Sequence, residues 1–426
     1  MGLGFVRVRL FRALGVAVLA AFLSSESAAA TAPIDLGLPS ALSPGAEGFS
    51  SERLVRVESM FKREIEAEHF AGATWMIVRD GQIVTHGAAG YSNIAGKRAM
   101  AEDSVFRIMS MSKLITTVTC LTLIEEGRIN LDDPVTLYLP ELAIPKVYIG
   151  GPPEAPQLVP ANGPVTIRQL LTQTSGYSYG FFDTGPIRSI YDKADLWNAT
   201  TLPEFVKRAS TLPLIFQPGT AWNYGINTDL LGAIIEKVAG KPLGDVMRER
   251  IFAPLGMDET GFTPPADPSR LATIYEHGQK GLTEMVSFHS PRFESGGGGL
   301  YSTLHDYARF AEMLLNKGSL NGVRILGPKT VEMMTTSQVG YLNPRPIARY
   351  VPQGFGFGVR VQLDDPSSSP SLGSPGRYGW EGILTTYVSI DPKERLILLE
   401  MMQLSPYDDG EIFERFTNTA YQAIEK

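Results

Sequence analysis

The chain has 426 residues, of which 43% are hydrophobic, and a formal net charge of −7. This length and composition suit one large globular unit or two domains. Because an acidic surface repels phosphate backbones, nucleic acid is not an expected partner.

Residues 1–30 have the pattern of a secretory signal peptide. Three arginines precede an apolar stretch over 13–23, and three alanines at 28–30 form a small-residue cleavage site. The apolar stretch is too short for a stable membrane anchor. We therefore predict an exported, periplasmic or secreted protein that starts with a lead segment over 31–50. Without residues 1–30, the chain has 35 basic and 44 acidic residues, a net charge of −9.

The next elements follow from hydrophobic spacing. An amphipathic helix is expected over 51–69, then two strands over 73–79 and 82–87, joined by the hairpin signal Asp80-Gly81. A helix over 114–126 stops at Gly127 and contains Cys120, the only cysteine, which we expect to be buried. Further predictions are helices over 165–174, 202–210, 227–239, 243–250, 303–316 and 411–424, strands over 385–390 and 396–402, and surface loops over 149–164 and 364–376.

Strands at both ends of the chain with helices between them predict an α/β (α+β) fold. We expect an antiparallel sheet flanked by helices and built from both chain ends, with an inserted, mainly helical domain. The sheet subdomain would take about 51–115 and 285–426, and the helical subdomain about 116–284. The active site would lie between them.

Ser110-Met111-Ser112-Lys113 is the strongest chemical signal in the sequence. A serine hydroxyl must lose its proton as it attacks, and a lysine three positions later on a helix lies on the same face. Burial would lower the pKa of Lys113 and allow it to act as a base. The alternative for Ser110 is a helix N-cap. Ser59 begins the same S-x-x-K spelling inside the first helix, where we expect it to be structural.

Tyr224 is the candidate proton relay. It follows a Pro-Gly turn and precedes the helix over 227–239, so its phenol could reach a domain junction. The alternative is a tyrosine packed beneath a loop. Tyr91 spells Y-x-N with Ser92 and Asn93 but lies in a strand-and-turn region before the nucleophile. The five histidines lack paired ligand spacing, so we expect no metal and no cofactor.

The sequence resembles the class C β-lactamase and penicillin-binding superfamily in the order of three motifs. They are S-x-x-K, the tyrosine before Asp229-Leu230-Leu231-Gly232, and Trp380-Glu381-Gly382. The similarity runs from about residue 51 to the end and is nearest to the family VIII carboxylesterases. It implies a β-lactamase/transpeptidase-like fold, Ser110 as the acylated nucleophile, and Lys113 and Tyr224 sharing the base and acid roles. The backbone N–H groups of Ser110 and Ile383 would form the oxyanion hole.

Three positions depart from the pattern of that superfamily. Trp380 stands where its β-lactamases and penicillin-binding proteins commonly have lysine, and Ile226 replaces the asparagine of Y-x-N. Gln173 stands where histidine is frequent. An uncharged Trp380 cannot pair with a carboxylate, which favours neutral esters bound beside Trp380 and Gly382.

A second serine has a motif of its own. Residues 176–180 spell G-x-S-x-G around Ser178, the nucleophile elbow of another hydrolase fold, but the strand–turn–helix context is missing. We expect instead that Tyr177, Tyr179, Phe181 and Phe182 line an apolar acyl pocket.

The predicted function is a serine carboxylesterase that hydrolyses small, short-acyl esters through an acyl-enzyme, with weak β-lactam hydrolysis. A β-lactamase or D-amino-acid peptidase (DD-peptidase) is the nearest alternative. A non-catalytic penicillin-binding-type receptor is the alternative of another class. The expected partner is a small-molecule ester.

Overall fold

The structure is a computed structural model that describes residues 37–143, 145–279, 281–288, 290–342, 353–364, 369, 371–406 and 411–426. The predicted signal peptide and the first part of the lead segment lie outside the described residues. Part of the predicted loop over 364–376 does so too. Residues 35–426 group as one unit. Within the described residues, no helix is long and apolar enough to cross a membrane.

The secondary structure contains the predicted elements with small shifts of their ends, and further short elements. The helices are α1 Ser51–Glu66, α2 Ser112–Glu125, α3 Ile167–Leu171, α4 Gly185–Ala194, α5 Leu202–Ala209, α6 Asn227–Ala239, α7 Leu243–Met247, α8 Ala253–Leu255, α9 Leu304–Leu315, α10 Pro328–Met334 and α11 Glu411–Tyr421. The strands are β1 Gly72–Arg79, β2 Gln82–Asn93, β3 Arg98–Ala99, β4 Phe106–Arg107, β5 Lys146–Gly150, β6 Gln157–Pro160, β7 Tyr275–Gly278, β8 Gly281–Glu284, β9 Tyr301–Ser302, β10 Ser319–Leu320, β11 Val323–Arg324, β12 Gly354–Phe355, β13 Arg360–Val361, β14 Tyr378–Gly382, β15 Thr386–Asp391, β16 Leu396–Met401 and β17 Leu404–Ser405.

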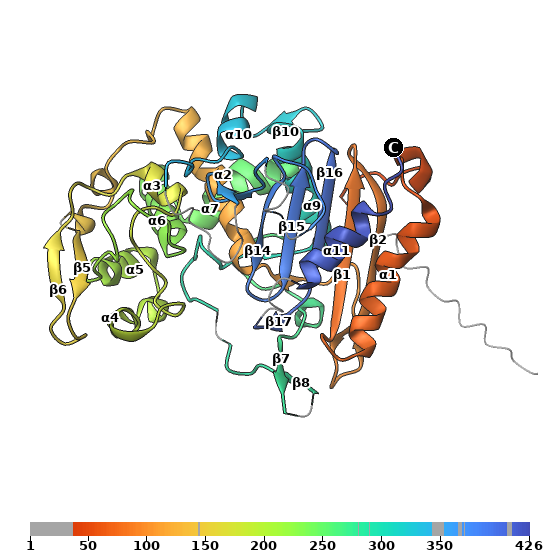
Figure 1. Cartoon of the computed structure of the whole chain (residues 1–426), viewed down its shortest axis with the longest axis horizontal. Coiled ribbons are helices and arrows are strands. Elements are labelled where there is room, and N and C mark those ends of the chain that lie inside the picture. The colour runs from red at the N-terminus through yellow and green to blue at the C-terminus, as the bar shows by residue number, and fades with distance from the viewer. Residues whose placement is uncertain are drawn as a thin grey trace, which may run out of the picture. The chain divides into compact units, whose positions relative to one another are not determined.

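An eight-stranded sheet forms the centre of one half of the molecule (Figure 1), with the order β12-β13-β14-β15-β16-β1-β2-β3. Every neighbouring pair in it is antiparallel. Strand β1 from the start of the described chain pairs with β16 from its end, with Trp75 opposite Glu400. The prediction of an antiparallel sheet built from both chain ends is therefore confirmed.

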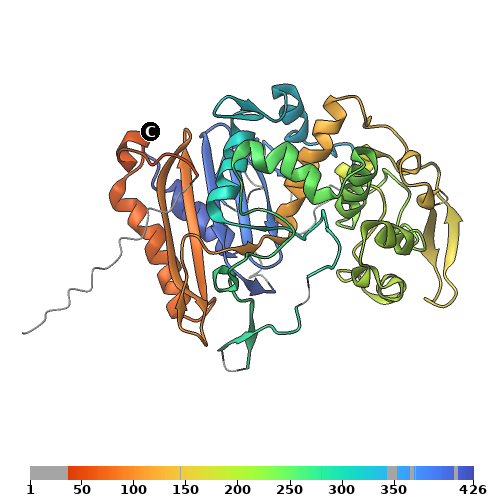
Figure 2. The same cartoon turned by 180° about the vertical axis from the view of Figure 1, so that it is seen from behind.

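Helices cover both faces of this sheet. On one face α1 and α11 pack through a hydrophobic cluster in which Phe61 stacks on Trp75, with ring centroids 4.6 Å apart, and contacts Phe416. On the opposite face α9 lies against β1, β15 and β16 (Figure 2). Helix α2, whose described residues are almost all buried, joins this second layer to α6 and α7 of the helical region. Buried apolar surface on both sides thus holds the start of α2 close to the sheet.

Two hairpins lie within residues 116–284, the stretch that was expected to form a mainly helical subdomain. Strand β6 and the last two residues of β5 lie in the stretch predicted as a surface loop over 149–164, so that prediction was wrong for the paired residues. The chain pairs there because Val147 is buried and opposes Val159, while the Pro/Gly-rich residues form only the connecting turn. Strands β7 and β8 form the second hairpin, and β7 pairs in parallel with β17 near the end of the chain.

Candidate active site

Ser110 lies in a 3-10 turn over Met109–Met111 that runs directly into α2. Sequence reasoning placed it in the first turn of the helix itself, so the serine is slightly earlier than predicted. Met109 has a φ of 46°, a left-handed conformation that costs a non-glycine residue about 1–3 kcal/mol. The surrounding packing therefore has to hold this turn in place.

The end of β14 and the start of β15 supply that packing. The hydroxyl of Thr386 donates a hydrogen bond to the carbonyl oxygen of Ile108 at 3.1 Å. A Cβ atom added at Gly382 would lie only 2.5 Å from the same oxygen. Gly382 is therefore needed for close approach of the strand to the Ser110 turn, whereas sequence reasoning gave it a substrate-binding role, and it is not among the residues that line the cleft.

Lys113 lies beside Ser110, as the spacing predicts. Its Nζ is 3.3 Å from Ser110 Oγ and donates to the carbonyl oxygen of Gly297 at 2.6 Å. The side chain is 1% exposed, and this burial lowers the pKa of Lys113 to about 7, against the opposing effect of the Asp229 carboxylate. Near neutral pH, a large fraction of Lys113 can therefore be uncharged and accept a proton.

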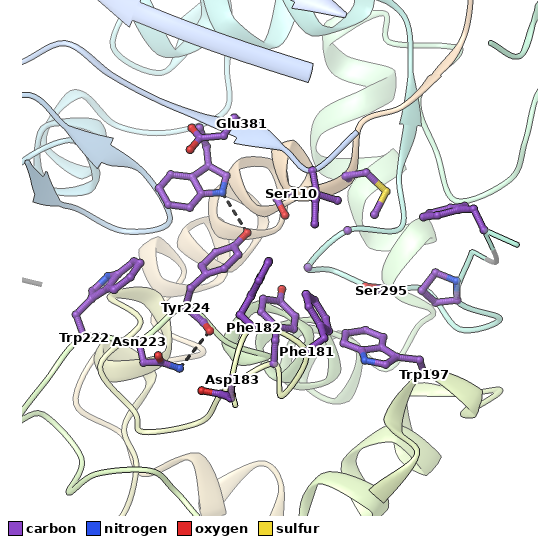
Figure 3. Close-up of a pocket in the computed structure, with 18 residues that line it drawn as sticks. Ser110, Phe181, Phe182, Asp183, Trp197, Trp222, Asn223, Tyr224, Ser295 and Glu381 are labelled. Atoms are coloured by element: carbon purple, nitrogen blue, oxygen red, sulfur yellow. Dashed lines mark hydrogen bonds between the residues drawn. The ribbon is translucent and has the colours of Figure 1, made fainter. Parts of the chain in front are cut away.

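Tyr224 comes from the loop before α6 and meets the same serine. Its phenol points toward Ser110 (Figure 3), and its oxygen accepts the indole N–H of Trp380 at 3.1 Å. Burial raises the pKa of Tyr224, while the hydrogen bonds from Ser110 and Trp380 oppose that shift. The phenol therefore keeps its proton at neutral pH, which suits a proton donor.

Asp229 is a buried charge at the site that sequence reasoning missed. It is fully buried on α6, where Oδ1 accepts the Ser295 hydroxyl at 2.5 Å and the Gly297 N–H at 3.0 Å. Its Oδ2 has no hydrogen-bond partner. Burial raises the pKa of Asp229, and Lys113 lowers it. The sequence offered Asp229 only as one letter of a matching motif, because its partners are 66 and 68 positions away.

A cleft of about 630 Å³ opens at Ser110 between the sheet and the helical region. Phe181, Phe182 and Tyr224 point into the same space as Ser110 (Figure 3). The aromatic lining residues are Tyr179, Phe181, Phe182, Trp197, Trp222, Tyr224, Phe288 and Trp380. The structure thus brings Phe181, Phe182 and Trp380 to the cleft as predicted.

Tyr177 differs from that prediction. It is 3% exposed and is not a lining residue, because the chain alternates there and turns Tyr179 toward the cleft instead. Ser110 and Ile383 both line the cleft, from the turn before α2 and from the residue after β14. Their backbone N–H groups as an oxyanion hole stay a prediction.

Glu381, the charged residue of the third motif, lines the cleft but is paired with a cation. It accepts a hydrogen bond from Arg360 at 3.2 Å. Among the described residues that line the cleft, none is lysine, arginine or histidine. The cleft therefore offers a substrate carboxylate no side-chain cation on its walls.

The other two candidate serines, Ser178 and Ser59, donate their hydroxyl groups to neighbouring groups of the fold. Ser178 is 1% exposed and donates to the carboxylate of Asp183, which closes the loop that carries Phe181 and Phe182. The preceding element is helix α3, and no strand leads into Ser178, so the elbow geometry is missing. In α1, Ser59 donates to the carbonyl oxygen of Val55 at 2.9 Å, as expected for a serine inside a helix.

Comparison with known proteins agrees with this fold. The family model described as "Beta-lactamase" matches residues 57–416. Protein Rv1367c of Mycobacterium tuberculosis is 34% identical over 366 residues, covering 81% of this chain and 88% of that protein. Esterase EstB of Burkholderia gladioli is 29% identical over 399 residues, covering 87% and 91%.

The solved structures include EstCE1, described as a hydrolase with promiscuous acyltransferase activity. It superposes with a TM-score of 0.75 at 24% identity, covering 88% of this chain and 99% of EstCE1. The fold, the extent of the family match and these relatives lead to one conclusion. The chain belongs to the β-lactamase family, as a serine hydrolase with a β-lactamase/transpeptidase-like fold that is related to the family VIII esterases.

Proposed function

We propose that this protein is a serine carboxylesterase that hydrolyses small carboxylic esters with short acyl chains through an acyl-enzyme on Ser110. The observation that carries the proposal is that Lys113 and Tyr224 both lie beside the hydroxyl of Ser110. Lys113 Nζ lies 3.3 Å from Ser110 Oγ, and the phenol of Tyr224 points toward the same hydroxyl in the cleft (Figure 3). A weak nucleophile is thus given a buried base and a buried acid.

The proposed acylation follows from the opposed pKa shifts of these two groups. Neutral Lys113 accepts the Ser110 proton as Oγ attacks the ester carbonyl carbon. The backbone N–H groups of Ser110 and Ile383 stabilise the oxyanion, where each donor is typically worth about 10²–10³ in rate. Tyr224 gives its phenolic proton to the departing alkoxide, and the proton held by Lys113 restores the phenol. Water then attacks acyl-Ser110 by the same sequence in reverse.

The lining of the cleft supports neutral esters. Trp380 brings only an indole N–H, which Tyr224 already accepts, and Glu381 pairs with Arg360. A substrate carboxylate would forgo a charge-assisted hydrogen bond worth about 1.5–3 kcal/mol, or roughly 10- to 150-fold in affinity. The aromatic walls favour apolar groups on the ester. Weak β-lactam hydrolysis is part of the proposal, because the acylation step is the same.

A comparison of substrates tests this proposal. We expect p-nitrophenyl acetate and butyrate to exceed p-nitrophenyl octanoate in kcat/KM by about tenfold or more, a typical discrimination by pocket size. A chromogenic cephalosporin should be turned over far more slowly. Faster turnover of the cephalosporin than of any ester would instead favour a β-lactamase or DD-peptidase. A stable covalent adduct without turnover would favour a penicillin-binding-type receptor.

Acyl transfer to an alcohol is the second candidate, and the aromatic cleft favours it. Walls of this kind hold an apolar alcohol better than water at the acyl-enzyme. The test is p-nitrophenyl butyrate hydrolysis with benzyl alcohol present, with products separated by gas chromatography. Benzyl butyrate formed only by enzyme with an intact Ser110 supports transfer, and butyrate as the sole product argues against it.

We also propose that the protein is exported after cleavage of residues 1–30. The support is the charge and hydropathy pattern of that segment. Expression of the full chain in a bacterial host and intact-mass measurement of the periplasmic protein provide the test. A protein that keeps residues 1–30 and stays in the cytoplasm would contradict export.

A further inference from the structure

Gln173 contacts the loop of Tyr224 on both sides of the tyrosine. Its backbone oxygen accepts the N–H of Asn223 at 2.9 Å, and its side-chain Oε1 accepts the N–H of Gly225 at 3.0 Å. These are the two residues that flank Tyr224 in the chain. One residue, 51 positions before Tyr224, thus binds the backbone N–H groups of the residues before and after it.

The side chain of Gln173 is itself held in one orientation. Its Oε1 also accepts the side-chain N–H of Asn227, and Nε2 lies 3.4 Å from the hydroxyl of Thr228. The Ser175 hydroxyl in turn donates to the Asn227 side-chain oxygen. Gln173 is 1% exposed, so these bonds do not compete with solvent. Two N–H donors on one oxygen fix which end of the amide faces the loop.

The backbone around Gln173 and Gly225 leaves little room for other arrangements. Gln173 has a φ of 59°, a left-handed conformation rare for its residue type. A Cβ atom added at Gly225 would lie 2.3 Å from the carbonyl oxygen of Tyr177. The Tyr224 loop is therefore pressed against the 173–178 segment.

We propose that Gln173 is a positioning residue for the esterase reaction: it holds the Tyr224 phenol against Ser110 by binding the peptide groups on both sides of it. The inference rests on the proposed function, because it assigns Gln173 a role through Tyr224. It predicts a defect in turnover and not in substrate binding, since Gln173 is not among the residues that line the cleft.

Two substitutions remove the side-chain acceptor in different ways. Gln173→Met has similar length and no polar atom that can replace Oε1. Gln173→Asn keeps the amide but is one methylene too short to reach Gly225, and asparagine tolerates a positive φ better than glutamine. With p-nitrophenyl butyrate we expect both to lower kcat about 10- to 100-fold with KM within about threefold, the scale of a small misplacement of a reacting group.

Rescue and a matched control separate positioning from general destabilisation. Gln173→Glu keeps an oxygen that can accept both N–H groups and should recover kcat to within about fivefold of wild type. Gln169→Met removes the amide that caps α3, where Oε1 accepts the Thr166 N–H at 3.0 Å; its Nε2 lies near Gly219, but Gln169 makes no hydrogen bond with Asn223 or Gly225, the residues that flank Tyr224. It should lower the melting temperature and leave kcat within about twofold.

The outcomes are distinct. Three results would each overturn the inference. The first is a normal kcat in Gln173→Met and Gln173→Asn, and the second is no recovery of kcat in Gln173→Glu. The third is a loss of kcat in Gln169→Met equal to that in Gln173→Met. So would failure of both Gln173→Met and Gln173→Asn to fold while Gln169→Met folds, because Gln173 would then serve the fold alone. Failure of the proposed function looks different: wild type would not hydrolyse the ester, or Ser110→Ala would remain active.

Discussion

Two buried side chains flank the Ser110 hydroxyl, and burial shifts their pKa values in opposite directions. The pKa of Lys113 falls to about 7, and that of Tyr224 rises. Burial penalises the charged form of each group, which is the ammonium of the lysine and the phenolate of the tyrosine. The same desolvation therefore produces a base and an acid from neighbouring residues.

This difference predicts the pH dependence of the enzyme. The active form needs neutral Lys113, so kcat/KM should rise with pH through an apparent pKa near 7 and be lost below it. Asp229 raises the pKa of Lys113 through its charge. In Asp229→Asn, which keeps an oxygen for Ser295 and Gly297, the acidic limb should move to lower pH. Measurement of kcat/KM for p-nitrophenyl butyrate from pH 5 to 9 would detect it, and a limb that stays or moves upward contradicts this account.

At the scale of elements, the loop between α3 and α4 controls the width of the cleft. Phe181 and Phe182 are 40% and 55% exposed, which is unusual for adjacent aromatic residues and places apolar surface at the entrance. The contact between Ser178 and Asp183 closes this loop, and Gly180 packs against Tyr191 at a φ of 79°. Residues 176–180, which match G-x-S-x-G, thus hold the loop that forms one wall of the cleft.

Replacing both phenylalanines with alanine tests the role of this wall. The cleft should widen, and the ratio of kcat/KM for p-nitrophenyl octanoate to that for the butyrate should increase about tenfold. Stability should change little, because both rings are partly exposed. Tyr341→Ala removes another exposed aromatic ring that does not line the cleft and serves as control. An unchanged chain-length profile in the double variant would count against a specificity role.

The elements that the sequence predicted well are those with a strong local period. Helix α6 and strand β1 match their predicted ranges within a residue. Strand β2 runs on to Asn93, beyond the predicted end at Gly87. Gly87 does not end the strand because it packs beneath Trp75: a Cβ atom added at Gly87 would lie 2.5 Å from the Trp75 ring. The two-residue strands β12 and β13 have no local pattern and exist only through pairing, β12 with β13 and β13 with β14.

The same distinction applies to the site. Ser110 and Lys113 share one helical turn, and Tyr224 precedes a clear helix, so local spacing and the resemblance were enough to find them. Asp229 and Gln173 make contacts at the site across more than 50 positions, so the motifs that contain them do not show what they touch. The width of the cleft likewise depends on how the sheet and helical region pack.

At the scale of the whole molecule, one buried carboxyl group opposes the stability of the sheet. Glu400 is fully buried in β16, opposite Trp75 and Tyr387, and neither carboxylate oxygen has a hydrogen-bond partner. Burial raises the pKa of Glu400 well above its ordinary value. The folded protein therefore binds a proton there that the unfolded chain releases above about pH 4.3. Stability must fall as pH rises from that value toward the folded pKa.

Glu400→Gln removes this dependence. Its melting temperature should exceed that of wild type at pH 8 by at least about 2 °C, with a smaller difference at pH 5. Glu52→Gln, at an exposed position on α1, is the control and should change neither value. A difference that is the same at pH 5 and pH 8 would show that folding does not raise the pKa of Glu400.

The measurement that tests the central claim most directly is intact-mass labelling with a fluorophosphonate, alongside p-nitrophenyl butyrate hydrolysis. Wild type, Ser110→Ala and Ser178→Ala are compared. The account predicts a single adduct and ester hydrolysis in wild type and in Ser178→Ala, and the loss of both in Ser110→Ala alone. Loss of both in Ser178→Ala, with Ser110→Ala still labelled and active, would contradict the assignment of the nucleophile and the mechanism built on it.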